Sequence, residues 1–107
     1  MESIVKPIIW SKRAKKDLEK ILFFNATLLG EDKAKKIVFK IFQRTLILEN
    51  RMVDFKKIGI IDEDFLHLKN EYRKLTEKNY RITYREGKTK IFIVRVFDMR
   101  QNPKKNL

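Results

Sequence analysis

Apolar side chains recur at three- and four-residue spacing in two stretches of the first half of the chain. This spacing is typical of the inner face of an α-helix. Ser11 can cap the first helix, Gly30 ends it, and Glu31 or Asp32 opens the second, which predicts an antiparallel helical hairpin with a very short loop. The expected inner faces are Ala14, Leu18, Ile21, Leu22, Asn25, Leu28 and Leu29 on the first helix, and Ala34, Ile37, Val38, Ile41, Phe42, Thr45 and Leu48 on the second.

Strand-like patterns lie on either side of this hairpin. A run rich in β-branched residues at 4–10 contains Pro7, which places it at a sheet edge or leaves one ladder bond unmade. Three further strands are expected at 72–75, 80–85 and 90–98, joined by turns at 76–79 and 86–88. The last of these strands is apolar on both faces, as a central strand should be. Residues 60–68 fit either a short helical turn or an edge strand.

The order strand, helix, helix, three-strand meander predicts a small two-layer α+β domain. In this fold a two-helix hairpin packs on a small, mostly antiparallel sheet. The 107 residues have room for one domain, so we expect a single domain over 1–107. Apolar residues make up 43% of the chain, which is typical of a globular protein and excludes extensive disorder.

The residue types that are scarce exclude several kinds of chemistry. The chain has no cysteine and one histidine, His67, so disulfides, thiolate sites and multi-histidine metal sites are excluded. Its three glycines form no phosphate-cradling pattern. We therefore expect neither a metal nor a cofactor.

The net charge of the chain indicates which kinds of partner it attracts. Lys and Arg number 26 against 14 Asp and Glu, a net charge of +12, and residues 69–107 alone hold twelve basic against four acidic side chains. Such a field attracts nucleic acid, an acidic membrane face or an acidic protein, although a generally lysine-rich soluble protein is the alternative. No signal peptide is apparent, because residues 1–3 lack a basic region and the apolar run at 7–10 is too short. No membrane span is apparent either, because the longest charge-free run has ten residues. This predicts a cytoplasmic protein without a membrane partner.

The strict alternation at 80–85 places Tyr80, Ile82 and Tyr84 on one face of the sheet and Arg81, Thr83 and Arg85 on the other. Several arginines on neighbouring strands form a fixed receptor for phosphate oxygens. The candidate nucleic-acid-binding residues are Arg73, Arg81, Arg85 and Arg95. The alternative is an ordinary solvated sheet face.

Other polar residues are weaker candidates. His67 is expected to be a surface or half-buried residue rather than a general base, and Asp62, Glu63 and Asp64 to form a solvated turn or helix start. The expected role of Asp98 is an ion pair that orients Arg100. Phe23, Phe24 and Phe39 fall off the main helical faces and are expected to widen the core or to bind a partner.

The ordered set of motifs resembles the RelE/ParE superfamily of toxins from bacterial type II toxin–antitoxin pairs. The motifs are Trp10-Ser11 with Ala14, Asp17, Leu18 and Ile21, then Tyr72-Arg73-Lys74-Leu75, Asn79-Tyr80-Arg81-Ile82-x-Tyr84-Arg85, and Ile91-x-Ile93-Val94-Arg95-Val96-Phe97-Asp98-x-Arg100. The likeness spans nearly the whole chain, more loosely at 50–68. It implies two helices packed on a small antiparallel-type sheet.

The resemblance implies two mechanisms. RelE-like members are metal-independent endoribonucleases that cut messenger RNA on the ribosome, and by this likeness Arg81, Arg100 and Lys74 are the candidate catalytic residues. Those members usually end in a catalytic tyrosine or histidine, which residues 101–107 lack. ParE-like members poison DNA gyrase and lack the ribonuclease residues, so this or another non-nuclease route is slightly favoured. A non-toxic basic module that binds nucleic acid or protein is the third possibility.

An acidic antitoxin is the expected partner. A strongly basic small domain needs an acidic protein to mask it, and a disordered antitoxin can wrap such a surface by folding on binding. The groove between the helices and the exposed phenylalanines would receive its helix. We expect a toxin–antitoxin hetero-oligomer, with gyrase or the ribosome and its messenger RNA as the target.

Overall fold

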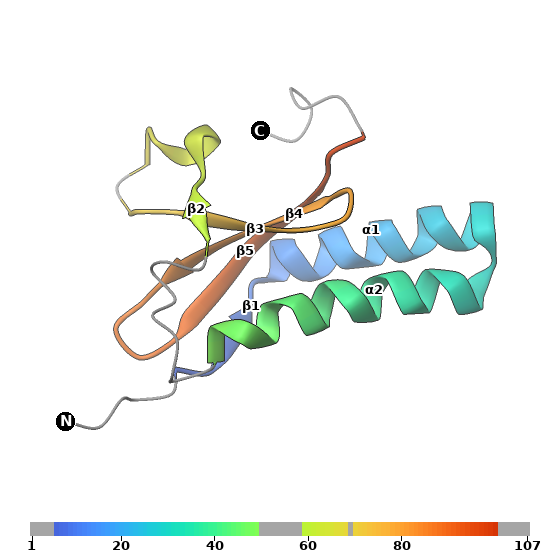
Figure 1. Ribbon diagram of the computed structural model, residues 1–107, viewed down its shortest axis with the longest axis horizontal. Helices are drawn as coiled ribbons and strands as arrows, with labels where there is room; N and C mark the ends of the chain where they lie inside the picture. Colours follow the sequence, from blue (N-terminus) through green and yellow to red (C-terminus); the bar gives the residue numbers. More distant parts are fainter. Residues whose placement is uncertain (1–5, 50–58, 69, 101–107) are drawn as a thin grey trace.

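The computed structural model describes residues 6–49, 59–68 and 70–100. A hairpin of two helices, α1 (Lys12–Leu29) and α2 (Glu31–Thr45), covers one face of a five-stranded sheet (Figure 1). The strands are β1 (Ile8–Trp10), β2 (Ile60–Ile61), β3 (Arg73–Glu77), β4 (Tyr80–Glu86) and β5 (Ile91–Asp98), with short 3-10 helices η1 (Leu46–Glu49) and η2 (Glu63–Phe65). The predicted two-layer α+β fold is confirmed.

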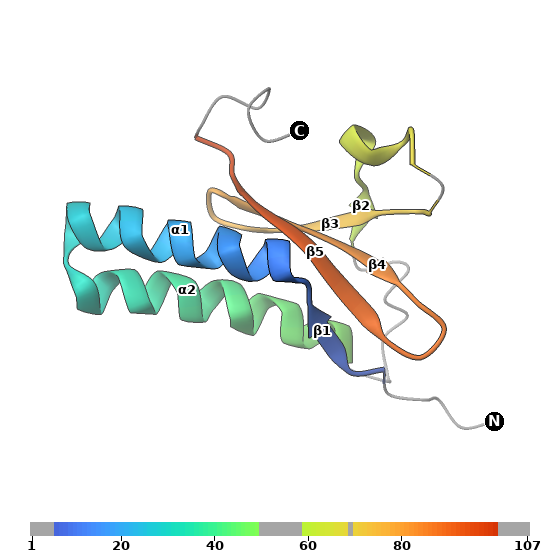
Figure 2. The same cartoon turned by 180° about the vertical axis from the view of Figure 1, so that it is seen from behind.

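The sheet has the strand order β1-β5-β4-β3-β2. β1 pairs with β5 in parallel, and all other pairs are antiparallel. β5 is therefore an interior strand between β1 and β4, and β1 lies at an edge, as predicted; seen from behind, β5 crosses the sheet beside α1 (Figure 2). Residues 60–68 contain both structures that their pattern allowed, the edge strand β2 and the short helical turn η2. The meander differs in one respect: β3 extends to Glu77, which leaves a turn of only Lys78 and Asn79.

Local chemistry explains the bounds of the helices. The Ser11 hydroxyl oxygen accepts a hydrogen bond from the Ala14 amide at 3.0 Å and so caps α1. Gly30 alone connects the helices, with φ +93° and ψ 160°, a conformation that is essentially restricted to glycine. Glu31 and Asp32 place negative charge at the start of α2, where the helix dipole favours it.

The core lies between the hairpin and the sheet. The helices contribute Ala14, Ile21, Ala34 and Ile41, and the sheet contributes Leu75, Tyr80, Ile82, Tyr84, Ile91, Ile93 and Val96. The predicted inner faces are confirmed except at three positions: Leu28 and Leu29, in the last turn of α1, are exposed, and Phe42 is exposed although its ring stacks on Trp10. The hairpin extends beyond the sheet at the end where Gly30 joins the helices, so the last turn of α1 has no strand to cover (Figure 1).

An irregularity in β5 sets which side chains face the helices. Thr83 pairs with Arg95 and Tyr84 with Ile93, which leaves Val94 without a partner on β4. This bulge shifts the alternation by one residue. Ile91, Ile93 and Val96 therefore all face the helices, while Phe92, Arg95 and Phe97 share the outer face with Arg81, Thr83 and Arg85.

Within the described ranges, no helix is long and apolar enough to cross a membrane.

Candidate functional site

The outer face of the sheet, opposite the helices, carries arginines interleaved with aromatic rings. Arg81 lies opposite Phe97 and Arg85 opposite Phe92 in the β4–β5 register. The Arg81 guanidinium carbon is 4.3 Å from the centroid of the Phe97 ring, and that of Arg85 is 4.5 Å from the Phe92 ring. These cation–π contacts hold the two side chains against the sheet.

Arg81 is also held by two carboxylates from the segment before β3. Its Nη1 donates to Asp64 Oδ2 at 2.5 Å, and its Nε lies 3.6 Å from Asp62 Oδ2. Asp62 is buried and also accepts a hydrogen bond from the Thr83 hydroxyl at 2.7 Å. Of the two expectations for 62–64, a solvated turn or a helix start, the helix start is confirmed: Asp62 caps η2 by accepting from the Asp64 amide. The segment is not fully solvated, because Asp62 is buried and lies against Arg81 and Thr83 on the sheet.

Arg95 pairs with an acid from α1. Its Nε donates to Asp17 Oδ2 at 2.8 Å, and the same oxygen accepts the backbone amide of Val96 at 2.9 Å. Asp17 is buried, although an acidic residue in a helix is usually solvated. Beyond the end of β1, the Asp17 carboxylate accepts a backbone hydrogen bond of β5 that the carbonyl of a neighbouring strand would otherwise accept.

Arg73 and Lys74 lie on opposite faces of β3. Arg73 Nε donates to Glu71 at 2.9 Å and its Nη1 to the Gly59 carbonyl at 2.8 Å. Lys74 is half-buried opposite Thr83, so it shares the outer face with Arg81. Arg85 differs from the other sheet arginines, because among the described residues it has no carboxylate within salt-bridge distance.

Arg100 lies on the other side of the sheet. Its Nη2 donates to Asp98 Oδ2 at 2.8 Å and to the Tyr80 hydroxyl at 3.1 Å, and Tyr80 faces the helices. The predicted ion pair between Asp98 and Arg100 is confirmed. The structure therefore brings Lys74 and Arg81 to one face and leaves Arg100 on the other.

Hydrogen bonds and burial shift three pKa values near these arginines. Burial alone would raise the pKa of Asp98, but hydrogen bonds from the Arg100 side chain and amide outweigh it and lower that pKa. The same hydrogen bond raises the pKa of Arg100. Burial raises the pKa of Tyr84, against a hydrogen bond from the Gly59 amide. His67 is exposed in the turn after η2.

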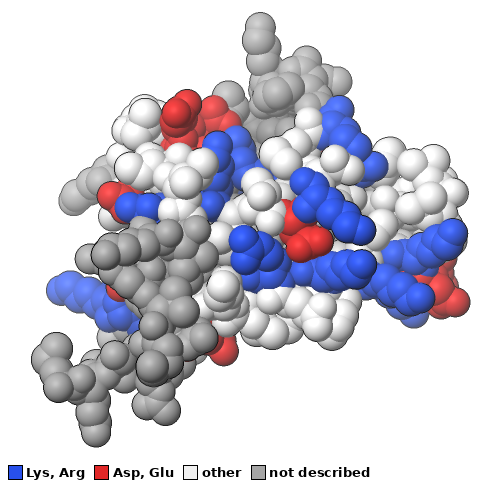
Figure 3. Space-filling model, viewed as in Figure 1, with Lys and Arg blue, Asp and Glu red and all other residues white. Residues whose placement is uncertain are grey.

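The surface is basic well beyond these arginines. Figure 3 shows Lys and Arg side chains spread over the hairpin and the adjoining end of the sheet, with few acidic side chains between them. In the part of the chain that the structure describes, no three His, Cys, Asp or Glu side chains lie close enough to hold a metal ion. The assignment of Arg73, Arg81, Arg85 and Arg95 to nucleic-acid binding, and of Arg81, Arg100 and Lys74 to catalysis, stays a prediction.

Sequence reasoning missed the acidic partners of these arginines. One position could have indicated such a partner: Asp17 is an acidic residue in an otherwise apolar helix face between Ala14 and Ile21. Asp62 had no comparable signal, because its segment shows no clear periodicity.

Comparison with known proteins is consistent with this architecture. Residues 8–103 match a family model described as the ParE toxin of the type II toxin–antitoxin system parDE. No curated protein matches the chain. A solved structure described as the chromosomal ParDE toxin–antitoxin system from P. aeruginosa superposes with a TM-score of 0.74 at 24% identity, covering 88% of this chain and 96% of that one. The likeness to that structure is one of fold.

Proposed function

The chain belongs to the ParE toxin family and is the toxin of a type II toxin–antitoxin system, and from this premise we propose that it inhibits growth by acting on DNA gyrase. ParE-like members of the superfamily poison gyrase, whereas RelE-like members cleave messenger RNA. Gyrase poisoning needs no catalytic side chain of the toxin. We also propose that a cognate acidic antitoxin holds the toxin inactive.

The ion pairing of Arg81 is the observation that carries the proposal. In a ribonuclease this side chain would have to meet a phosphate, but here two carboxylates already face it: Asp64 accepts from Nη1, and buried Asp62 lies 3.6 Å from Nε, which donates no hydrogen bond among the described residues. A phosphate would have to displace two carboxylates, one of them buried, from a nearly enclosed guanidinium. This cost favours a structural role for Arg81 over contact with RNA.

The other requirements of RNA cleavage support the same proposal. Metal-free cleavage needs a base for the ribose 2′-hydroxyl, an acid for the leaving oxygen and cations for the charge on phosphorus. Arg100 is separated from Arg81 by the sheet, and the raised pKa of Tyr84 keeps that hydroxyl protonated at neutral pH. Of the other two candidate catalytic residues, Lys74 shares the outer face with Arg81 and Arg100 does not, so the three do not form one site.

Charge and exposed apolar side chains support the antitoxin partner. The net charge of +12 favours an acidic protein, and three large side chains on the hairpin are open to solvent: Phe23 is 76% exposed, Leu28 63% and Phe39 58%. An amphipathic acidic segment complements such a surface with its apolar side chains and its carboxylates together.

A supercoiling assay with purified gyrase tests the proposal. We expect the toxin to inhibit gyrase and to leave topoisomerase I, on the same DNA, unaffected. Topoisomerase I is the necessary control, because a protein of charge +12 can coat DNA and block any enzyme that acts on it. Equal inhibition of both enzymes would contradict a specific effect on gyrase.

A pulse of expression in cells separates the two targets. We expect thymidine incorporation to fall before amino-acid incorporation does. An earlier fall in amino-acid incorporation would instead support the ribonuclease mechanism and make Arg81, Arg100 and Lys74 the substitutions to test. A fall in neither incorporation would contradict both targets and favour the third possibility, a basic module that binds nucleic acid or protein.

A further inference from the structure

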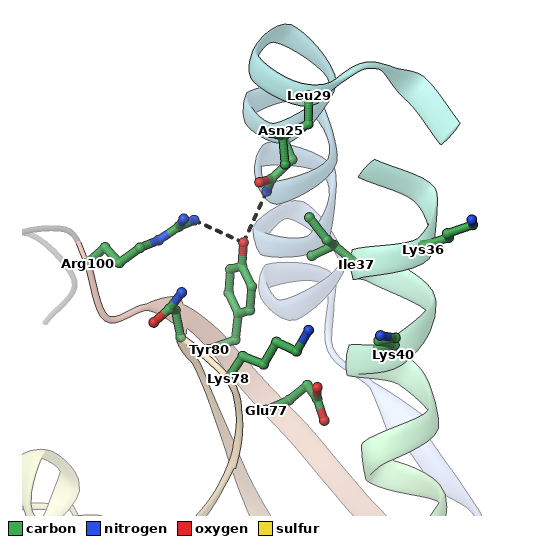
Figure 4. A pocket seen from close by; sticks show the side chains of 10 residues that line it. Asn25, Leu29, Lys36, Ile37, Lys40, Glu77, Lys78, Tyr80 and Arg100 are labelled. Atoms are coloured by element: carbon green, nitrogen blue, oxygen red, sulfur yellow. Dashed lines mark hydrogen bonds between the residues drawn. The ribbon is translucent and has the colours of Figure 1, made fainter. Parts of the chain in front are cut away.

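A cavity of about 180 Å³ opens between the helical hairpin and the turn that joins β3 to β4. Figure 4 shows its two sides: α1 and α2 form one, and the β3–β4 turn with Arg100 forms the other. Its walls combine buried polar side chains, aliphatic side chains and a cationic rim. No step of the proposed action on gyrase uses it.

The floor of the cavity is a polar cluster with an unused hydrogen-bond donor. Asn25 is 2% exposed and Tyr80 5%. The Tyr80 hydroxyl oxygen accepts hydrogen bonds from Asn25 Nδ2 and from Arg100 Nη2, both at 3.1 Å. Among the described residues the hydroxyl hydrogen itself has no acceptor. Because the oxygen accepts two bonds, the hydroxyl is a strong donor for a ligand that brings an acceptor.

The rim of the cavity is cationic. Lys36 and Lys40 on α2 and Lys78 on the β3–β4 turn line it with Arg100, against the single carboxylate of Glu77. In Figure 4 Lys78 reaches from the turn toward α2, where Lys40 projects. Within residues 6–49, 59–68 and 70–100, the three lysines have no carboxylate within salt-bridge distance. Their charges are therefore available to an incoming anion.

The backbone of Lys78 determines where its side chain leaves the turn. Its φ is +52°, and it is the only residue other than glycine with a positive φ in the described part of the chain. A two-residue β-hairpin turn requires a positive φ at its first residue, so the tight turn of Lys78 and Asn79 accounts for this conformation. The turn thereby brings the Lys78 side chain to the lining of the cavity.

The size and lining of the cavity indicate which anion it takes. At about 180 Å³ it is smaller than the sites of most small-molecule ligands, which span roughly 300–1,000 Å³. Leu29 and Ile37 make part of its wall aliphatic, which suits the methylene stem of an acidic side chain. A nucleic-acid backbone would instead need a continuous cationic groove for its repeated phosphates.

We propose that this cavity receives the carboxylate of an aspartate or glutamate side chain of the antitoxin, bound by the Tyr80 hydroxyl and neutralised by Lys40 and Lys78. This inference rests on the antitoxin part of the proposed function and is independent of the gyrase target. The carboxylate enters beside the end of α1, where the exposed Leu29, which lines the cavity, offers an apolar contact to the same segment. The cavity thus fixes the register of the antitoxin on the hairpin.

The test is the dissociation constant of the full toxin and its full-length cognate antitoxin, measured by calorimetry at 0.15 M salt. We expect Lys40→Glu combined with Lys78→Glu to weaken binding by at least about tenfold. The matched control reverses two exposed lysines outside the cavity, Lys15→Glu with Lys33→Glu, for the same change in net charge. Equal weakening by both pairs would overturn the proposal in favour of general electrostatic attraction.

Two further variants separate binding from folding. Lys78→Gly should raise the melting temperature of the free toxin, because glycine accepts a positive φ, and yet weaken antitoxin binding. Tyr80→Phe should weaken binding about three- to tenfold, as expected for one lost hydrogen bond. Unchanged affinity in both variants would overturn the inference.

The same complexes distinguish this inference from the proposal on which it rests. If the wild-type toxin does not bind its antitoxin, the partner assignment and the cavity fail together. If it binds and the cavity variants bind equally well, the cavity alone fails. In cells, the Lys40→Glu, Lys78→Glu toxin should remain toxic and escape protection by the antitoxin, and full protection would count against the cavity.

Discussion

At the scale of single residues, Asp98 shows how a buried acid fixes an arginine. Its carboxylate accepts from the Arg100 amide and from two nitrogens of the Arg100 side chain at 2.8–3.0 Å. These bonds favour the ionised acid and lower its pKa despite its burial. A group whose pKa is lower in the folded chain stabilises the fold above its unfolded pKa, and the stabilisation is lost as the pH falls.

The pH dependence of unfolding should therefore change in Asp98→Asn. In the wild type, the contribution of Asp98 is complete at neutral pH and is lost as the pH falls below about 4. The variant should be less stable at pH 7 by about 1–3 kcal/mol, as expected for hydrogen bonds to a charged group, and should lose less stability on acidification. Urea unfolding across this pH range measures both effects. Glu19→Gln, at an exposed position in the middle of α1, is the control and should follow the wild type.

The pairing of Asp98 with Arg100 was predictable because the two residues are neighbours at a strand end. The role of Tyr80 was not. Alternation placed Tyr80 correctly on the helix side, but its contact with Asn25 joins residues 55 positions apart. A pattern along the chain carries no information about which distant polar side chain a buried hydroxyl meets.

At the scale of elements, the edge of β5 shows how α1 replaces a strand. β1 pairs only with Ile91–Ile93, and beyond it the Ser11 hydroxyl donates to the Val94 carbonyl and Asp17 accepts from the Val96 amide. An edge covered in this way is not available to pair with another chain. Periodicity predicted the helix and the strand, but it gave no structural role to Asp17.

Substitution of Asp17 should loosen α1 from the sheet. Asp17→Asn removes the charge that neutralises Arg95 and weakens the acceptor for the Val96 amide. We expect a loss of about 2–4 kcal/mol in the free energy of unfolding, as for other broken buried ion pairs. Chemical denaturation measures it, and Glu19→Gln, on the exposed side of the same helix, is the control. A loss as small as that of the control would mean that the pair contributes little.

At the scale of the whole molecule, the charge of +12 was evident from composition, but its distribution was not. Strand alternation grouped Arg81, Thr83 and Arg85 correctly on one face. It could not show that Asp17, Asp62 and Asp64 neutralise Arg81 and Arg95, because these acids come from segments far away along the chain. The fold was predictable to the level of its layers and the order of elements along the chain, but not to the parallel pairing of β1 with β5, and the candidate site only to the level of residue types.

The salt dependence of nucleic-acid binding tests which arginines are available to a phosphate. For single strands, log K falls with log salt by about 0.7 for each phosphate contact. We expect Arg85→Gln to reduce this slope by about that amount, and Arg81→Gln, already paired with two carboxylates, to leave it unchanged. Fluorescence anisotropy with a labelled oligouridine from 50 to 300 mM salt gives the slopes. A reduced slope in Arg81→Gln would restore this residue as a phosphate contact.

The parallel pairing of β1 with β5 also determines at what stage of translation the fold of this toxin can form. Ser11, at the end of β1, and Val94, which accepts its hydroxyl hydrogen bond, are 83 residues apart in the chain. A contact between such distant residues forms late, because most of the chain must be present before the loop between them can close. β5 is translated after the hairpin and after β3 and β4, and until it emerges the helical hairpin has no complete sheet to cover. A translation product interrupted before β5 therefore lacks the toxin fold.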